Sequence, residues 1–224
     1  MSERILSLDI STKTGWSLAL SDADGCHIAH YGQTEPIPEP KGEYPYRVWD
    51  WTYKCFSVIE KLIKEHHPDV LVIEQTSKGS KASKTQKLLE WIHFLVADYI
   101  IKRSMKNVYL QTGEWRSLVG SKMTKDEKTR NKYVKDYKAK YLAEHGQEYT
   151  IGKNGKKKKK AIVVYDEEGV RIGKVGKKNV SVRTANEIFG PQLKRPLQRK
   201  DEDAAEALLL AYAYHRRTNA LQKS

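Results

Sequence analysis

Two short apolar runs that each lead into a carboxylate restrict the fold of this chain more than any other feature. Residues 5–10 are strand-like and carry Asp9, and the continuous apolar run 70–73 ends at Glu74. A run of the second kind is typical of a central strand that is covered on both faces. Segments 15–20 and 26–33 have strand composition and short connections, which predicts an antiparallel meander after the first strand.

Helical patterns alternate with these strands. Apolar residues recur at spacings of three and four over residues 48–63 and again over residues 88–100, which predicts two amphipathic helices. A short strand follows at residues 108–110, and an Ala- and Leu-rich helix is expected over residues 202–216. These elements predict an α/β fold with a five-stranded mixed sheet flanked by helices, in one domain over residues 1–224.

A third acidic segment opens the last helix, where Asp203 and Glu206 are three residues apart and share one helical face. Small and apolar neighbours predict that this helix packs closely on the sheet, where several carboxylates need a cation to stay ionised together. Hard oxygen ligands favour Mg²⁺ or Mn²⁺. With Asp9 and Glu74 there are enough carboxylates for two ions about 4 Å apart, which clamp the attacking and leaving oxygens in phosphodiester cleavage.

Each of these acids has a simpler explanation when it is taken singly. Asp9 or Glu74 could merely end a strand, and the helix macrodipole favours acids in the first turn of a helix. The order of three strands, a helix, a strand with an acid, a helix and a final acidic helix is what favours a metal site.

Charge divides the chain into two parts. The chain has 41 Lys and Arg against 28 Asp and Glu, a net charge of +13, yet residues 1–75 hold only 7 basic and 12 acidic residues. The excess of positive charge in the rear part favours a polyanionic partner, nucleic acid first. No apolar run approaches the roughly 18 residues of a membrane span, and no signal peptide is recognisable. Two cysteines without metal-ligand spacing favour a reducing, cytoplasmic setting.

Residues 148–185 differ in composition from the rest of the chain. Gly and Lys abound there, and segments 161–165 and 170–175 alternate like strands around an acidic turn. This pattern predicts a basic β-hairpin inserted into the domain. Its lysines favour two alternatives, a clamp on DNA phosphates or a solvated loop.

Several segments together resemble the RuvC-type Holliday junction resolvases of the ribonuclease H-like superfamily, and the divergent phage-encoded members more than the bacterial enzyme. The matching segments are residues 5–16, 72–75 and 202–208, with a weaker match at residues 115–120 before a Lys-rich helix start. The resemblance covers the elements of residues 1–145 and 200–217.

The resemblance implies a homodimeric endonuclease that binds branched DNA, the four-way junction, and nicks two strands of like polarity. It implies two Mg²⁺ or Mn²⁺ ions per active site, no small-molecule cofactor and no membrane partner, and for a phage protein the host cytoplasm. The implied metal ligands are Asp9, Glu74, Asp203 and Glu206, and Lys125 would support the scissile phosphate. Asp201 competes with Asp203, but the spacing to Glu206 favours Asp203. The expected DNA contacts are Lys78, Lys81, Lys84, Arg116, Lys122, Lys156, Lys157 and Lys158.

Two departures from the family leave alternatives open. The bacterial enzymes have an aromatic wedge three residues after the second acid, where this chain has Ser77, and the hairpin at 148–185 has no recognised counterpart. A nuclease for flaps, forks or RNA–DNA hybrids is therefore the first alternative, and a non-catalytic DNA-binding module is the second. The first segment also resembles the phosphate loop of actin-like sugar kinases, but 224 residues are too few for their two domains.

Overall fold

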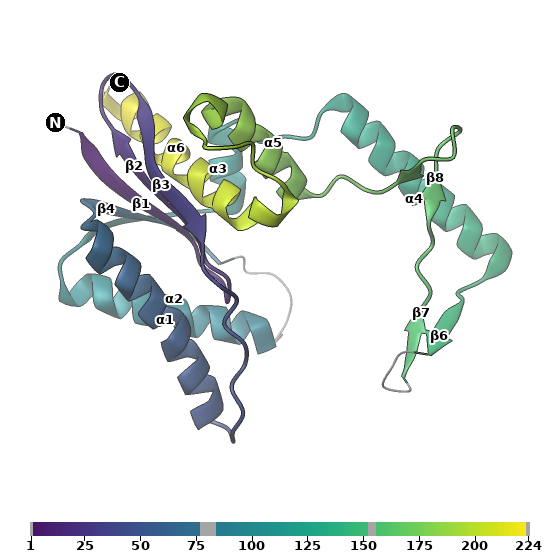
Figure 1. Ribbon diagram of the computed structural model, residues 1–224, viewed down its shortest axis with the longest axis horizontal. Helices are drawn as coiled ribbons and strands as arrows, with labels where there is room; N and C mark the ends of the chain where they lie inside the picture. The colour runs from purple at the N-terminus through teal and green to yellow at the C-terminus, as the bar shows by residue number, and fades with distance from the viewer. Residues whose placement is uncertain (1, 77–83, 152–155, 223–224) are drawn as a thin grey trace. The chain divides into compact units, whose positions relative to one another are not determined.

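Strand β1 (Glu3–Asp9) is the central strand of a five-stranded sheet in the order β3-β2-β1-β4-β5 (Figure 1). It pairs antiparallel with β2 (Gly15–Ser21), which pairs antiparallel with β3 (Cys26–Gln33). On its other side β1 pairs parallel with β4 (Val70–Glu74), and β4 pairs parallel with β5 (Lys106–Leu110). The predicted mixed sheet of five strands is confirmed. The structure is a computed structural model that describes residues 2–76, 84–151 and 156–222.

Helices cover both faces of this sheet. Helices α1 (Tyr46–His66) and α2 (Lys84–Lys102) lie on one face, and α3 (Thr112–Leu118) and α6 (Glu202–Gln222) lie on the other (Figure 1). Each face has its own core, as expected of an α/β sheet that is buried on both sides. None of the described helices is long and apolar enough to cross a membrane.

The alternation of side chains along β1 assigns its residues to the two cores. Leu6 and Leu8 pack in the core under α1 and α2, whereas Ile5 packs in the core under α6. Because successive side chains point to opposite faces of a strand, Asp9 falls on the same face as Ile5. The same rule places Glu74 on the α6 face, since Val70 and Val72 pack there.

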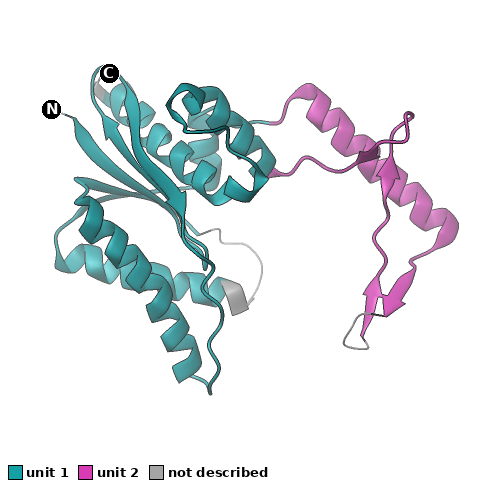
Figure 2. Cartoon of the chain, in the orientation of Figure 1, with its two compact units in different colours: residues 1–122, 178–224 teal, residues 123–177 magenta. Residues whose placement is uncertain are grey.

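Residues 123–177 form a second compact unit, and residues 1–122 with 178–224 form the first (Figure 2). Among its described residues, the second unit has one long helix and two small antiparallel sheets. Its elements are α4 (Lys125–His145), β6 (Tyr149–Ile151), β7 (Lys157–Lys159), β8 (Val164–Tyr165) and β9 (Arg171–Ile172). The β8–β9 pair turns at residues 166–169, where the sequence predicts a hairpin.

The end of the predicted hairpin segment has a different structure. Helix α5 (Lys177–Phe189) occupies residues that the Gly- and Lys-rich pattern assigned to the insertion. Val182, Ala185 and Phe189 recur at spacings of three and four and are buried in the core under α6, which explains the helix. Two 3-10 turns, Gly190–Gln192 and Arg199–Asp201, then lead into α6.

Candidate active site

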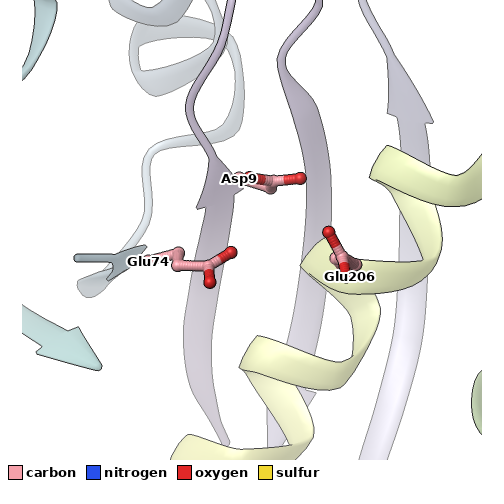
Figure 3. Close-up of side chains that lie close together, drawn as sticks. All are labelled: Asp9, Glu74 and Glu206. Atoms are coloured by element: carbon pink, nitrogen blue, oxygen red, sulfur yellow. The ribbon is translucent and has the colours of Figure 1, made fainter. Parts of the chain in front are cut away.

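Three carboxylates from separate elements meet at one end of the sheet. Asp9 is the last residue of β1, Glu74 is the last residue of β4, and Glu206 lies in the first turns of α6 (Figure 3). Each offers a carboxylate oxygen, and these oxygens all lie within 4.8 Å of one another. The parallel register that pairs Leu8 with Ile73 brings the two strand ends side by side. Three of the four acids predicted as ligands therefore converge.

Helix α6 approaches the sheet closely because the residues between them are small. The Ser7 hydroxyl donates a hydrogen bond of 2.7 Å to the carbonyl of Ala207, and the Ser17 hydroxyl donates one of 3.3 Å to the same carbonyl. At Gly15, an added Cβ would lie 2.0 Å from the carbonyl oxygen of Asp203. Glycine at this position thus permits the contact that sets Asp203 and Glu206 beside the strand ends.

The fourth predicted acid, Asp203, is buried next to this group and is paired with lysines. Lys178 Nζ lies 2.6 Å from Asp203 Oδ1, and Lys13 Nζ lies 3.9 Å from Asp203 Oδ2. Asp201 has a separate structural role, because its carboxylate accepts hydrogen bonds of 2.8 and 3.0 Å from Arg195. Asp203 thus lies close enough to act on Asp9, whereas Asp201 is paired with Arg195.

Electrostatic repulsion and burial act together on Asp9. Withdrawal from water raises the pKa of Asp9 well above its ordinary value, and the negative charges of Glu206, Glu74 and Asp203 raise it further. The ammonium group of Lys178 opposes this shift. A bound cation would offset the same repulsion, so this donor set of carboxylate oxygens fits a divalent ion such as Mg²⁺ or Mn²⁺.

Glu206 is held from several sides. Burial raises its pKa, while the positive charge of Arg116 and a hydrogen bond of 3.0 Å from the Ser181 hydroxyl lower it. The Arg116 guanidinium donates to Glu206 Oε1 and lies 4.5 Å from the centre of the Trp115 ring. Thr112 fixes the second strand-end acid in a similar way, by a hydrogen bond from its hydroxyl to Glu74.

Sequence reasoning missed Lys178 and Ser181 as members of this site. Both belong to α5, whose start is concealed by glycines and lysines that favour a hairpin. The spacing of three and four between the apolar residues Val182, Ala185 and Phe189 is the signal that could have revealed the helix. Arg116 was expected to contact DNA; its side chain is only 15% exposed and is paired with Glu206.

The structure describes only some of the other basic residues that were predicted to contact DNA or the scissile phosphate. Lys78 and Lys81 lie outside the described residues, as does the side chain of Lys84. Lys122 is exposed, and its carbonyl accepts a hydrogen bond of 3.0 Å from Arg183. In the second unit, Lys125 is the first residue of α4, and three further lysines are exposed at the β6–β7 hairpin: Lys156, Lys157 and Lys158.

Comparison with known proteins identifies the fold of this chain. No protein-family model matches the chain, and no curated protein matches it. Among solved structures, T. thermophilus RuvC in complex with a Holliday junction substrate is similar, with a TM-score of 0.55 and 8% identity over 97% of this chain and 96% of that chain. A second Thermus thermophilus RuvC structure has a TM-score of 0.51 and 11% identity over 98% and 96% of the two chains. The chain therefore has the fold of RuvC, an α/β architecture built on a mixed five-stranded sheet.

Proposed function

We propose that this protein is a structure-selective endonuclease that resolves four-way DNA junctions by metal-dependent hydrolysis of phosphodiester bonds. The observation that carries the proposal is the meeting of Asp9, Glu74 and Glu206 at one sheet end of a RuvC fold. One of the similar RuvC structures is a complex with a Holliday junction substrate. The excess of basic residues after residue 75 supports a DNA substrate.

Asp9, Glu74 and Glu206 would hold the metal, with Asp203 as a fourth ligand for a second ion. Divalent ions bound there would supply stabilisation of the negative charge on the scissile phosphate and would make a water more acidic. Hydrogen bonds from Thr112 to Glu74 and from Ser181 to Glu206 orient two of the ligands.

Basic residues would complete the site. Lys178 lies 2.6 Å from Asp203, so its ammonium group is placed to bind a non-bridging oxygen of the substrate phosphate next to the metal ligands. Lys125, the residue implied by the family resemblance, stays a prediction for the same role. In this proposal the four acids bind the cations and the lysines bind phosphate. Cutting therefore depends on the acids, whereas DNA affinity depends on the lysines.

Paired nicks in a junction require two active sites, and a homodimer would supply them. Helix α2 exposes large apolar side chains that a partner could cover: Trp91 is 39% exposed, Phe94 71% and Ile101 75%. Such a patch on one helix supports an interface. The protein would act in the cytoplasm on branched DNA, and a phage origin stays a prediction.

Cleavage of labelled substrates tests this function. A four-way junction, a duplex, a flap and an RNA–DNA hybrid are compared in Mg²⁺, in Mn²⁺ and in chelator, for the wild type and for Asp9→Asn, Glu74→Gln, Asp203→Asn and Glu206→Gln. We expect metal-dependent paired nicks in the junction that each substitution abolishes, while DNA binding is largely kept because it rests on basic residues.

Asp201→Asn is the matched control, because Asp201 is two residues from Asp203 but is paired with Arg195. We expect this variant to cut. Normal cutting by Asp203→Asn would remove Asp203 from the ligand set. Cutting mainly of flaps or hybrids would change the substrate class, and tight binding without cutting in any divalent metal would favour a binding module.

A further inference from the structure

Helix α4 carries four of its lysines on one side and has little buried apolar surface. Only one of its 21 residues, Val134, is buried. At about 100° per residue, four lysines fall within a sector of about 80° on the helix. They are Lys125, Lys128, Lys132 and Lys135, and all four are exposed. The first-turn acids fall outside this sector, and Asp136 lies at its edge.

The other side of α4 is covered by its own unit. Arg130 Nε donates a hydrogen bond of 2.9 Å to the Gly173 carbonyl, and the Asn131 side chain exchanges two hydrogen bonds, of 2.7 and 3.0 Å, with the backbone of Val175. Tyr133 donates to the Tyr165 carbonyl at 3.4 Å. The chain that returns from the hairpins therefore packs on this side of α4 and leaves the lysine sector open within the unit.

These four lysines are not used for internal pairing. None of their ammonium groups forms an ion pair in the part of the chain that the structure describes, whereas Lys140 on the same helix lies 3.9 Å from Glu144. The carboxylate of Glu127 caps the helix by accepting from the backbone of Thr124. An aligned row of lysines without internal partners has a large excess of positive potential on one face.

The β6–β7 hairpin does not offer an equal surface. Lys157, Lys158 and Lys159 are consecutive in β7, so their side chains alternate between the two faces of the strand. Lys160 is paired with Glu148 at 2.6 Å. A single polyanion could therefore meet only part of this lysine run, while the four lysines of the α4 sector lie on one side of their helix.

The chemistry of the α4 face selects its ligand. From Lys125 to Lys135 the row spans about 15 Å, over which one strand of duplex DNA carries about four phosphates. The sector has no large apolar residue between these lysines to enter a bilayer, and lysine is depleted in protein interfaces. Residues 123–177 have sixteen Lys and Arg against eight Asp and Glu, a net charge of +8.

We infer that Lys125, Lys128, Lys132 and Lys135 bind the phosphate backbone of a duplex arm, without reading its sequence. This inference rests on the proposed function for the identity of the nucleic acid as DNA. Because phosphate contacts release counterions, the surface contributes affinity that falls steeply with salt. It would hold a junction arm while the first unit performs the chemistry.

Binding of a labelled duplex and of a four-way junction to the full chain, measured by fluorescence anisotropy in chelator, tests the inference. The variant carries Lys128→Gln, Lys132→Gln and Lys135→Gln, which keeps helix propensity and leaves Lys125 in place. We expect the slope of log affinity against log salt to fall by about three and the affinity to fall on the order of a hundredfold near 0.1 M salt.

A matched variant removes the same charge from α1 by Lys54→Gln, Lys61→Gln and Lys64→Gln, where each lysine is already paired with an acid. We expect little change in its slope, and we expect arginine at the three α4 positions to restore binding. Wild-type binding by the α4 variant, or equal losses in both variants, would overturn the inference. Because no cutting is needed, a chain that never cleaves junctions can still pass this test, and a resolvase can fail it.

Discussion

At the scale of single residues, the folded structure disfavours the charged form of Asp9 when no cation is bound. Asp9 is withdrawn from water beside three other carboxylates, and burial with this repulsion raises its pKa. The folded protein therefore holds a proton at Asp9 more readily than the unfolded chain does. Asp9 therefore stabilises the folded protein at low pH. This contribution to the free energy of unfolding is lost as pH rises above the ordinary carboxyl range.

Asp9→Asn is predicted to stabilise the metal-free protein, because it removes the charge and keeps the shape of the side chain. In chelator at pH 8 we expect a gain of about 1 kcal/mol in the free energy of unfolding, and a smaller gain near pH 4, where the wild-type carboxyl is protonated. Urea denaturation at both pH values measures this.

Asp98→Asn is the control for this substitution. Asp98 is exposed to solvent in part and is paired with Lys102 on α2, so its replacement should give no gain at pH 8. Addition of Mg²⁺ should raise the melting temperature of the wild type and not that of Asp9→Asn. If Asp9→Asn were less stable than the wild type in chelator, repulsion would not be the dominant effect at Asp9.

At the scale of elements, the contact of α6 with β2 sets the geometry of the site. Gly15→Ala would place a methyl group 2.0 Å from the Asp203 carbonyl oxygen and 2.2 Å from its carbonyl carbon, both backbone atoms of α6. The helix must then move away from the sheet, at a cost of about 3 kcal/mol. We expect loss of both thermal stability and junction cleavage, measured by calorimetry and by the nicking assay.

Gly113→Ala provides the comparison, since an added Cβ there meets nothing within 4 Å and the residue lies in α3. We expect unchanged cleavage and a gain of up to about 1 kcal/mol from helix propensity. If Gly15→Ala cut junctions at the wild-type rate, the close approach of α6 would not be required for catalysis.

Strand ends and helix phase explain which parts of the site could be predicted. Asp9 and Glu74 follow from apolar runs that end in acids, and Glu206 follows from its spacing to Asp203, because both signals are local in sequence. Lys178 could not be found in this way. It follows a Gly-rich segment that favours turns, and the apolar spacing of Val182, Ala185 and Phe189 that marks the helix begins only four residues after it.

The division of labour among basic residues is also a tertiary property. Arg116 has the sequence context of a surface residue, yet it is directed at Glu206 by the packing of α3 on α6. Composition predicted the polyanionic partner but did not separate the lysine row of α4 from the lysines of the hairpin. That separation appears only when the covered side of α4 is known.

At the scale of the whole molecule, the candidate metal ligands and the larger excess of positive charge belong to different compact units. The candidate metal ligands all lie in the first unit, whereas residues 123–177 have a net charge of +8. The chain leaves the first unit at Lys122, whose carbonyl accepts from Arg183 on α5, the helix by which the chain returns. A short linker can therefore join the two ends.

Replacement of residues 123–177 by a Gly/Ser linker is predicted to keep the metal site and to lose most of the DNA affinity. The Mg²⁺-induced rise in melting temperature should equal that of the full chain, because the acids, Lys178 and Arg116 remain. Junction affinity and its salt slope should both fall, because sixteen basic residues are removed.

Cutting by this shortened chain, measured at saturating junction and low salt, then tests the role of Lys125. A nicking rate near the wild-type rate would exclude Lys125 from the chemistry and leave Lys178 as the phosphate-binding lysine, whereas an intact metal response with no nicking would restore Lys125 to the site.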